Sequence, residues 1–224
     1  MTVRASAPAS ESRPLVDGHH RATLALCGRA LLSAWFATVT VAEFVGFAVP
    51  AGVGALTAAM NPAVSMPALL AAGVVEGAML GSGQAAVMRR ALPGLPGRLW
   101  IVVTASAAVL AYAIGLTPSS LAVDTWPRPL AAALAGIGGL VLLASIGTAQ
   151  WLVLRRHVAR AGPWIWATAA AWAAGLGVFL AFAMPLWRPG QSLWLVVGIG
   201  VIGGLLMAAT TSLITGATLT RLLR

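Results

Sequence analysis

The sequence predicts an all-α membrane protein with six transmembrane helices, arranged as three tandem two-helix hairpins around a pseudo-threefold axis. Of its 224 residues, 59% are hydrophobic and only 8% are charged, which is too apolar a composition for a water-soluble surface. Six apolar runs are long enough to cross about 30 Å of hydrocarbon, which takes about 20 residues of helix. A short motif also recurs three times, and such recurrence indicates a repeated structural unit.

The six apolar runs follow one another with short connections between them. We therefore expect one compact transmembrane domain, residues 29–224, with repeats at about 29–90, 98–156 and 163–224. Residues 1–28 are rich in Ala, Ser, Pro and Arg. We expect them to form a disordered cytoplasmic tail rather than a cleaved signal peptide, because the first apolar run starts late and contains Glu43. The runs cover residues 31–49, 64–88, 99–116, 130–154, 164–186 and 193–215.

The distribution of basic residues predicts the orientation. All fourteen are arginines. Twelve lie before the first apolar run, in the second and fourth connections or at the C-terminus, and the other two are Arg128 and Arg188. The positive-inside rule then places both termini in the cytoplasm of a bacterial cell, with the chain in the inner (plasma) membrane. We read the net charge of +9 as an orientation signal and a means of binding anionic lipid headgroups, not nucleic acid. The expected headgroup anchors are Arg89, Arg90, Arg155, Arg156 and Arg224.

Tryptophans support the same orientation. We expect Trp35, Trp100, Trp151, Trp164 and Trp166 near the cytoplasmic interface, as members of an aromatic belt. Trp126, Trp187 and Trp194 would lie near the opposite interface, and only Trp172 is expected inside the bundle.

The repeated motif reads GSGQAAVMRR at residues 81–90, GTAQWLVLRR at 147–156 and GATLTRLLR at 216–224. Its copies equate Gln84 and Gln150 with Leu219. Small residues at four-residue spacing also run along the second, fourth and sixth helices, which we expect to form the inner wall, because such spacing lets membrane helices approach closely. The expected packing glycines are Gly73, Gly77, Gly81, Gly139, Gly147, Gly200, Gly204 and Gly216.

Gln84 and Gln150 lie just inside the expected hydrocarbon boundary. One interpretation is a polar collar at the cytoplasmic mouth of a central path, interrupted at Leu219. The other, which we favour, is an interhelical hydrogen bond that fixes the register of the helices.

Glu43 and Glu76 are carboxyls inside spanning helices, where charge is costly and indicates function. They lie about 21 and 20 Å from the nearest cytoplasmic arginine anchors, at 1.5 Å per helical residue, and so at the same depth. No basic residue lies at that depth, so we expect these carboxyls to hold protons and, if adjacent, to share one. They are candidates for a proton or cation relay. The alternative is a pair of protonated acids bonded to the backbone or to neighbouring hydroxyls.

Few residues of the chain could support catalysis, cofactor attachment or metal binding. The chain contains no lysine, which excludes a Schiff base of retinal or pyridoxal and a P-loop lysine. Cys27 is the single cysteine, and the three histidines are expected in the cytoplasm, far from both glutamates. We therefore expect no enzyme activity, no cofactor and no metal site.

The segments QWLVLRR, GPWIWATAAAWAAGLG and LITGATLTRLLR resemble a group of uncharacterised bacterial polytopic membrane proteins, over roughly residues 64–224. The resemblance implies no activity. From the residues we expect transport or permeation of a small solute, ion or lipid, linked to protons through the intramembrane glutamates. The alternative is a non-catalytic scaffold or accessory subunit of a larger membrane complex, and a homo-oligomer is compatible with either.

Overall fold

The computed structural model describes residues 27–120 and 125–224. All but the last two residues of the predicted tail therefore lie outside the described residues. Within the described ranges, six helices are each long and apolar enough to cross a membrane, which indicates a multi-pass integral membrane protein. They are α1 (Gly28–Thr57), α2 (Pro62–Ala91), α3 (Gly97–Ser120), α4 (Arg128–Leu154), α5 (Pro163–Leu186) and α6 (Leu193–Leu222).

Several helices extend beyond the predicted apolar runs. The first predicted run ends at residue 49, but Pro50 lies inside α1, which continues to Thr57. Proline is tolerated within a spanning helix, where neighbouring groups can satisfy the freed backbone carbonyl. Asn61 begins α2 as its cap, because its side-chain oxygen accepts from the backbone N–H of Ala63 at 2.8 Å. Pro62 follows at the first helical position, where its missing N–H leaves no helical bond unmade.

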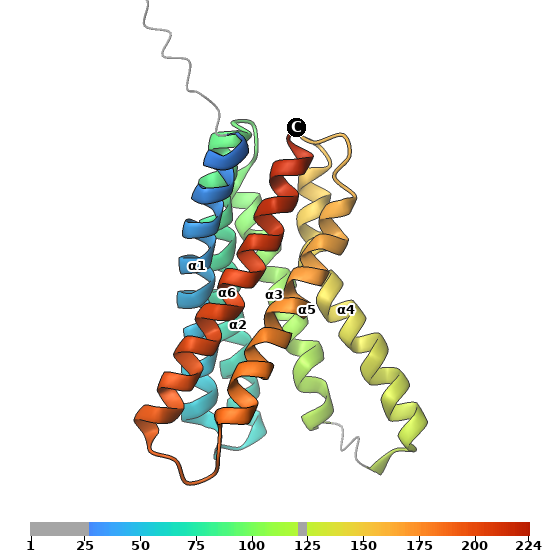
Figure 1. Cartoon of the computed structure of the whole chain (residues 1–224). Coiled ribbons are helices and arrows are strands. Elements are labelled where there is room, and N and C mark those ends of the chain that lie inside the picture. Colours follow the sequence, from blue (N-terminus) through green and yellow to red (C-terminus); the bar gives the residue numbers. More distant parts are fainter. Residues whose placement is uncertain (1–26, 121–124) are drawn as a thin grey trace, which may run out of the picture.

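The six helices form a closed ring. Each packs mainly against the helix before it and the helix after it, and α6 packs against α1 to close the circle. The start of α1 and the C-terminus lie at the same end of the bundle (Figure 1). We call this the arginine end, because Arg89, Arg155 and Arg224 also lie there.

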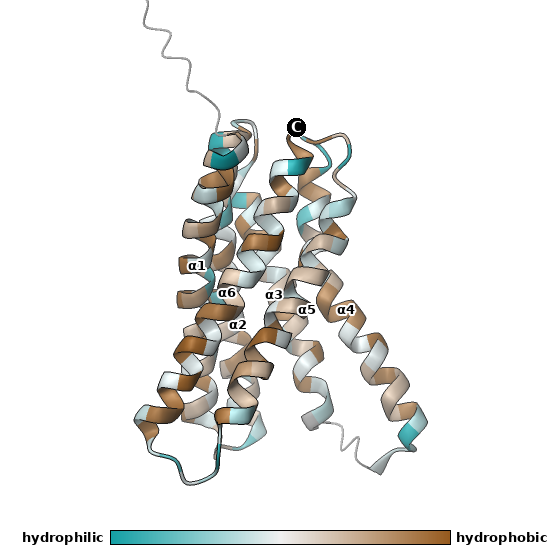
Figure 2. Ribbon diagram, in the orientation of Figure 1, coloured by the Kyte–Doolittle hydropathy of each residue, from teal (hydrophilic) through white to brown (hydrophobic). Residues whose placement is uncertain are grey.

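The ring is tight at the arginine end and open at the other. Figure 1 shows α4 diverging from its neighbours towards Arg128, its first residue. Large hydrophobic side chains are exposed along the outside of the bundle, and hydrophilic residues gather at the helix ends and in the loops (Figure 2). Such a surface suits lipid. The main buried hydrophobic cluster, by contrast, lies near the arginine end.

Candidate functional site

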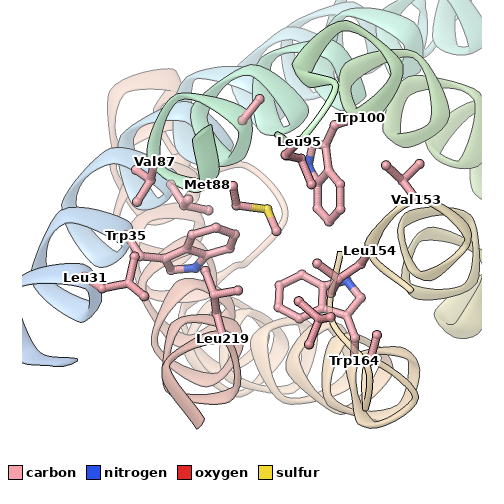
Figure 3. Close-up of a cluster of buried hydrophobic side chains, with 14 of the residues drawn as sticks. Leu31, Trp35, Val87, Met88, Leu95, Trp100, Val153, Leu154, Trp164 and Leu219 are labelled. Carbon is pink, nitrogen blue, oxygen red and sulfur yellow. The ribbon is translucent and has the colours of Figure 1, made fainter. Parts of the chain in front are cut away.

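Three tryptophans form the centre of the buried cluster at the arginine end. Trp35 of α1, Trp100 of α3 and Trp164 of α5 are each 0% exposed. The Trp164 ring makes edge-to-face contacts with Trp35 at 6.0 Å and with Trp100 at 6.1 Å between ring centres. Figure 3 shows the three indoles directed towards one another, among leucines and Met88. Our expectation that they serve as interface anchors was therefore wrong, because they point inward where the helices converge.

Each of these indoles donates a hydrogen bond to the preceding even-numbered helix around the ring. The distance is 3.0 Å in all three cases, and each bond is buried. The third copy differs in its acceptor: a threonine one turn away substitutes for the glutamine, whose position is taken by Leu219. The pairs are Trp100 Nε1 with Gln84 Oε1, Trp164 Nε1 with Gln150 Oε1, and Trp35 Nε1 with Thr215 Oγ1.

The two glutamines also bind each other. Gln150 donates from Nε2 to Gln84 Oε1 at 2.7 Å and to Thr104 Oγ1 at 2.9 Å. Both amide hydrogens of Gln150 are therefore used, and Gln84 Oε1 accepts two bonds. Gln84 is 3% and Gln150 0% exposed, so they lie inside a closed layer and not around an open mouth. The geometry is that of interhelical bonds that fix register.

We name this arrangement the tryptophan–glutamine layer. It consists of Trp35, Trp100, Trp164, Gln84, Gln150 and Leu219, which is 0% exposed. Its members come from all six helices, and it fills the narrow part of the ring.

A cavity of about 260 Å³ lies beyond this layer, towards the open end, and residues of all six helices line it. Its lining follows the repeat. Ala108 and Tyr112 lie eight and twelve residues after Trp100, and Trp172 and Leu176 lie eight and twelve after Trp164. We expected α2, α4 and α6 to form the inner wall, but the odd-numbered helices contribute equally.

Two of the even-numbered helices, α2 and α4, supply the matching positions, whereas α6 contributes Met207. Leu80 and Glu76 lie four and eight residues before Gln84, and Ile146 and Leu142 lie four and eight before Gln150; all four line the cavity. The carboxyl of Glu76 is therefore about 12 Å from the layer, at 1.5 Å per residue.

The structure brings both predicted glutamates to this depth. Glu76 is 5% exposed and faces the cavity, where its Oε2 accepts a hydrogen bond from the Tyr112 hydroxyl at 2.6 Å. Glu43 occupies on α1 the position that Ala108 and Trp172 occupy on α3 and α5, eight residues after the tryptophan. It is 0% exposed, and neither of its carboxyl oxygens has a hydrogen-bond partner among the described residues.

The two carboxyls lie within electrostatic range of each other, and the Thr211 hydroxyl is a further polar neighbour of Glu43. That hydroxyl donates to the Met207 carbonyl at 3.0 Å. The arginines of the described residues all lie at helix ends or in connections, so none of them neutralises this pair.

The expected packing glycines separate into two groups. Added Cβ atoms at six of them would meet atoms of a neighbouring helix within 3.4 Å, as expected for close approach. Added Cβ atoms at Gly139 of α4 and Gly200 of α6 would meet nothing within 4 Å, because the helices diverge towards the open end. These two glycines therefore make no close helix contact within the part of the chain that the structure describes. The six close-packed glycines are Gly73, Gly77, Gly81, Gly147, Gly204 and Gly216.

The five expected anchor arginines, Arg89, Arg90, Arg155, Arg156 and Arg224, are all exposed. The Arg155 guanidinium lies 4.8 Å from the centre of the Trp151 ring, a cation–π contact that orients it. No structural feature tests their binding to headgroups, which stays a prediction.

The sequence did not reveal that three tryptophans form a buried layer or that Tyr112 binds Glu76. A signal for two of the tryptophans was present, since WIVVT at 100–104 and WIWAT at 164–168 are a second repeated string. Tyr112 has no such signal, because it is the single tyrosine and its role depends on how α3 faces α2.

No family model, curated protein or solved structure matches the chain. The resemblance to bacterial polytopic membrane proteins therefore stays a prediction.

Proposed function

We propose that the chain is a membrane transporter that binds a small solute in the central cavity and couples its movement to protons through Glu43 and Glu76. The observation that carries the proposal is the position of the cavity. It lies within the ring, all six helices line it, and one of two buried, uncompensated carboxyls faces it. Intramembrane acids in such positions are typical of proton and substrate pathways.

The cavity lies between the tryptophan–glutamine layer and a second hollow. The tryptophan–glutamine layer blocks the arginine end. Towards the other end, Gly115 and Leu142 line both the central cavity and a second hollow between α3 and α4. A carrier with alternating access requires such a state, with its binding site open to one side.

The proposed topology is three tandem hairpins around a pseudo-threefold axis, with both termini in the cytoplasm. Equivalent positions of α3 and α5, and of α2 and α4, line the same cavity, which supports an axis through it. The arginine distribution supports the orientation. The arginine end, and with it the tryptophan–glutamine layer, would then face the cytoplasm.

The carboxyl pair supplies the coupling. Two ionised carboxylates close together in a medium of low dielectric repel strongly, and the arginines of the described residues lie at helix ends or in connections, too far away to offset that repulsion. The pair therefore retains at least one proton when no cation is bound. Movement of a solute through the cavity changes this environment, so protons are exchanged as it passes.

The test is proton flux in proteoliposomes loaded with a pH-sensitive dye, with the membrane potential clamped. A pH step is applied alone and with a panel of small amines, carboxylates and neutral aromatic solutes. We expect at least one class to accelerate dissipation of the gradient. The double variant Glu43→Gln, Glu76→Gln should fall to the rate of protein-free vesicles.

The control is Thr210→Val, because the exposed Thr210 hydroxyl donates within α6, to the Leu206 carbonyl at 2.8 Å. It should retain the wild-type rate. Equal flux in wild type and the double variant would exclude coupling through these glutamates.

One observation favours the alternative, an accessory subunit of a larger complex. Gly139 and Gly200 leave open space on the helix surface, and small residues there would admit a partner helix. Gly139→Leu and Gly200→Leu should then leave the isolated chain folded while reducing the size of its complex on native gels of solubilised membranes. An unchanged size would count against this function.

A further inference from the structure

We infer that the solute is a small lipophilic organic cation, bound with its charge against Glu76 and its apolar part against the aromatic wall of the cavity. This inference rests on the proposed function and names the substrate class of the same site. Three features of the cavity support it: its charge, its walls and its connection to lipid.

The charge of the site is complementary to a cation. Glu76 faces the cavity, and Glu43, within electrostatic range, has two oxygens without hydrogen-bond partners. A buried polar group without a partner is costly, and an ionised pair without a counter-ion is more so. A bound cation would supply the missing positive charge, and it would displace a proton from the pair.

The walls distinguish an organic cation from a metal ion. Hard cations exchange their hydration shell for six or more oxygen ligands. Here the polar groups that line the cavity come mainly from Glu76 and Tyr112, and the remaining walls are largely aliphatic or aromatic. Phe47 of α1, Tyr112 of α3 and Trp172 of α5 contribute aromatic rings from three sides. Weakly hydrated ammonium groups are attracted to aromatic faces, whereas small metal ions retain their water.

The size and the surroundings limit the ligand further. At about 260 Å³ the cavity lies below the usual range of about 300–1,000 Å³ for sites that take drug-sized ligands. A ligand with one aromatic ring and a compact ammonium head suits that volume. The shared lining at Gly115 and Leu142 connects the cavity to the hollow between α3 and α4. An amphiphilic cation concentrated in the bilayer would reach the site by this route.

The probe is benzyltrimethylammonium, and its control is neopentylbenzene, which has the same shape without the charge. Binding is measured by calorimetry on the full chain in lipid nanodiscs. We expect the cation to bind at least about tenfold more tightly than the neutral compound. Glu76→Gln should weaken the cation at least about tenfold and leave the neutral compound unaffected, as expected for loss of a buried charge partner.

The aromatic wall has its own matched pair of variants. Trp172→Leu removes a ring that lines the cavity, and we expect it to weaken the cation about three- to tenfold, as for a cation–π contact. Trp166→Leu removes a ring on the same helix that is 72% exposed on the outside, and it should change nothing. Thermal unfolding of each variant verifies that it is folded.

If Glu76→Gln does not fold, the wild-type protein still decides the question. A quaternary ammonium cannot titrate, so a loss of its binding at low pH reports protonation of the site. Within residues 27–120 and 125–224, the titratable groups around Glu76 are Glu43 from α1 and Tyr112 from α3, and α6 adds the Thr211 hydroxyl beside Glu43. We expect cation binding to fall as pH is lowered, with neopentylbenzene unaffected.

Equal binding of the two compounds, or cation binding indifferent to both Glu76→Gln and pH, would overturn the cationic substrate class and leave the transport proposal standing. Absence of binding by either compound would overturn the inference as well. The proton-flux experiment tests the transport proposal separately, because its panel includes solutes other than cations.

Discussion

At the scale of single residues, the hydrogen bonds of the tryptophan–glutamine layer determine how each amide is oriented. An indole N–H only donates, so Trp100 and Trp164 require the oxygens of Gln84 and Gln150 to face them. The Gln150 amide nitrogen is then left facing Gln84 and Thr104. These bonds link α2, α3, α4 and α5 across the narrow part of the ring.

Replacement of Gln150 by leucine should therefore destabilise the protein. The variant leaves the buried Trp164 N–H without an acceptor, and an unsatisfied buried donor costs about 1–3 kcal/mol. We expect a lower unfolding temperature in detergent. Gln191→Leu is the control, because Gln191 bonds Arg188 N and the Leu186 carbonyl in an exposed loop. If Gln150→Leu lowered the unfolding temperature no more than Gln191→Leu does, the layer would not have the stabilising role that we assign to it.

The sequence pointed to Glu43 and Glu76, because a charged residue stands out in an apolar run. It could not pair them with Tyr112 or a cavity, since that depends on the rotation of each helix about its axis. Trp35, Trp100 and Trp164 were assigned to an interfacial belt because they lie near helix ends. At a narrow end of a bundle, however, the same positions lie in the core.

At the scale of helices, close approach depends on where the ring is tight. At Gly147 of α4, an added Cβ would lie 2.8 Å from the Ile165 carbonyl oxygen and 3.0 Å from its Cα, both backbone atoms of α5. At Gly139, two turns away on the same helix, it would meet nothing within 4 Å. One helix thus passes from close packing to open space along its length.

Alanine at these two positions should have opposite effects. Gly147→Ala forces α4 and α5 apart, and overpacking of this kind costs about 1–3 kcal/mol. Gly139→Ala is expected to be neutral or to stabilise by up to about 1 kcal/mol, because alanine favours helix over glycine. Unfolding of both variants in mixed micelles measures the difference. Destabilisation by Gly139→Ala as large as that by Gly147→Ala would contradict the divergence of α4.

The number of spanning helices was predicted correctly, because hydropathy and length determine it. Their ends were not: α1 continues through Pro50 to Thr57 and α6 continues to Leu222. Hydropathy reports where apolar residues stop, whereas a helix stops where its backbone bonds end. The glycine spacing likewise predicted which positions could pack closely, but not that α4 leaves its neighbours.

At the scale of the whole molecule, the lone cysteine reports the proposed orientation. Cys27 precedes α1 at the arginine end and is exposed. In intact cells of a host whose outer membrane is permeabilised, a membrane-impermeant maleimide should fail to label it, and in inverted vesicles the reagent should succeed.

The opposite end provides the matched control for this labelling. Met60, between α1 and α2, is 51% exposed, so Met60→Cys in a Cys27→Ser background should be labelled in the permeabilised cells. The reverse pattern would place the arginine end outside and contradict the proposed topology.

A closed ring in which α1 starts and α6 ends at the same end of the bundle also predicts that the chain can begin elsewhere. We consider a circular permutant that begins at Arg160, runs to Arg224, is joined there to residue 1 and ends at Ala159. Residues 1–26 then serve as the linker between α6 and α1. Every helix keeps its original direction. The new ends fall between two exposed residues, the kind of site where permutation succeeds. The permutant makes α6 and α1 consecutive, and the α6–α1 contact already exists.

We expect this permutant to insert and to unfold within about 5 °C of the wild type, because a change of about 1 kcal/mol shifts the midpoint by only a few degrees. The same cut without the junction, as two co-expressed pieces, serves as the control and should assemble less stably, since association then costs translational and rotational freedom. If α6 and α1 packed only weakly against each other, joining them would add little stability, and the permutant would unfold at nearly the same temperature as the two pieces. Comparable instability of both would therefore contradict a continuous six-helix wall around the cavity.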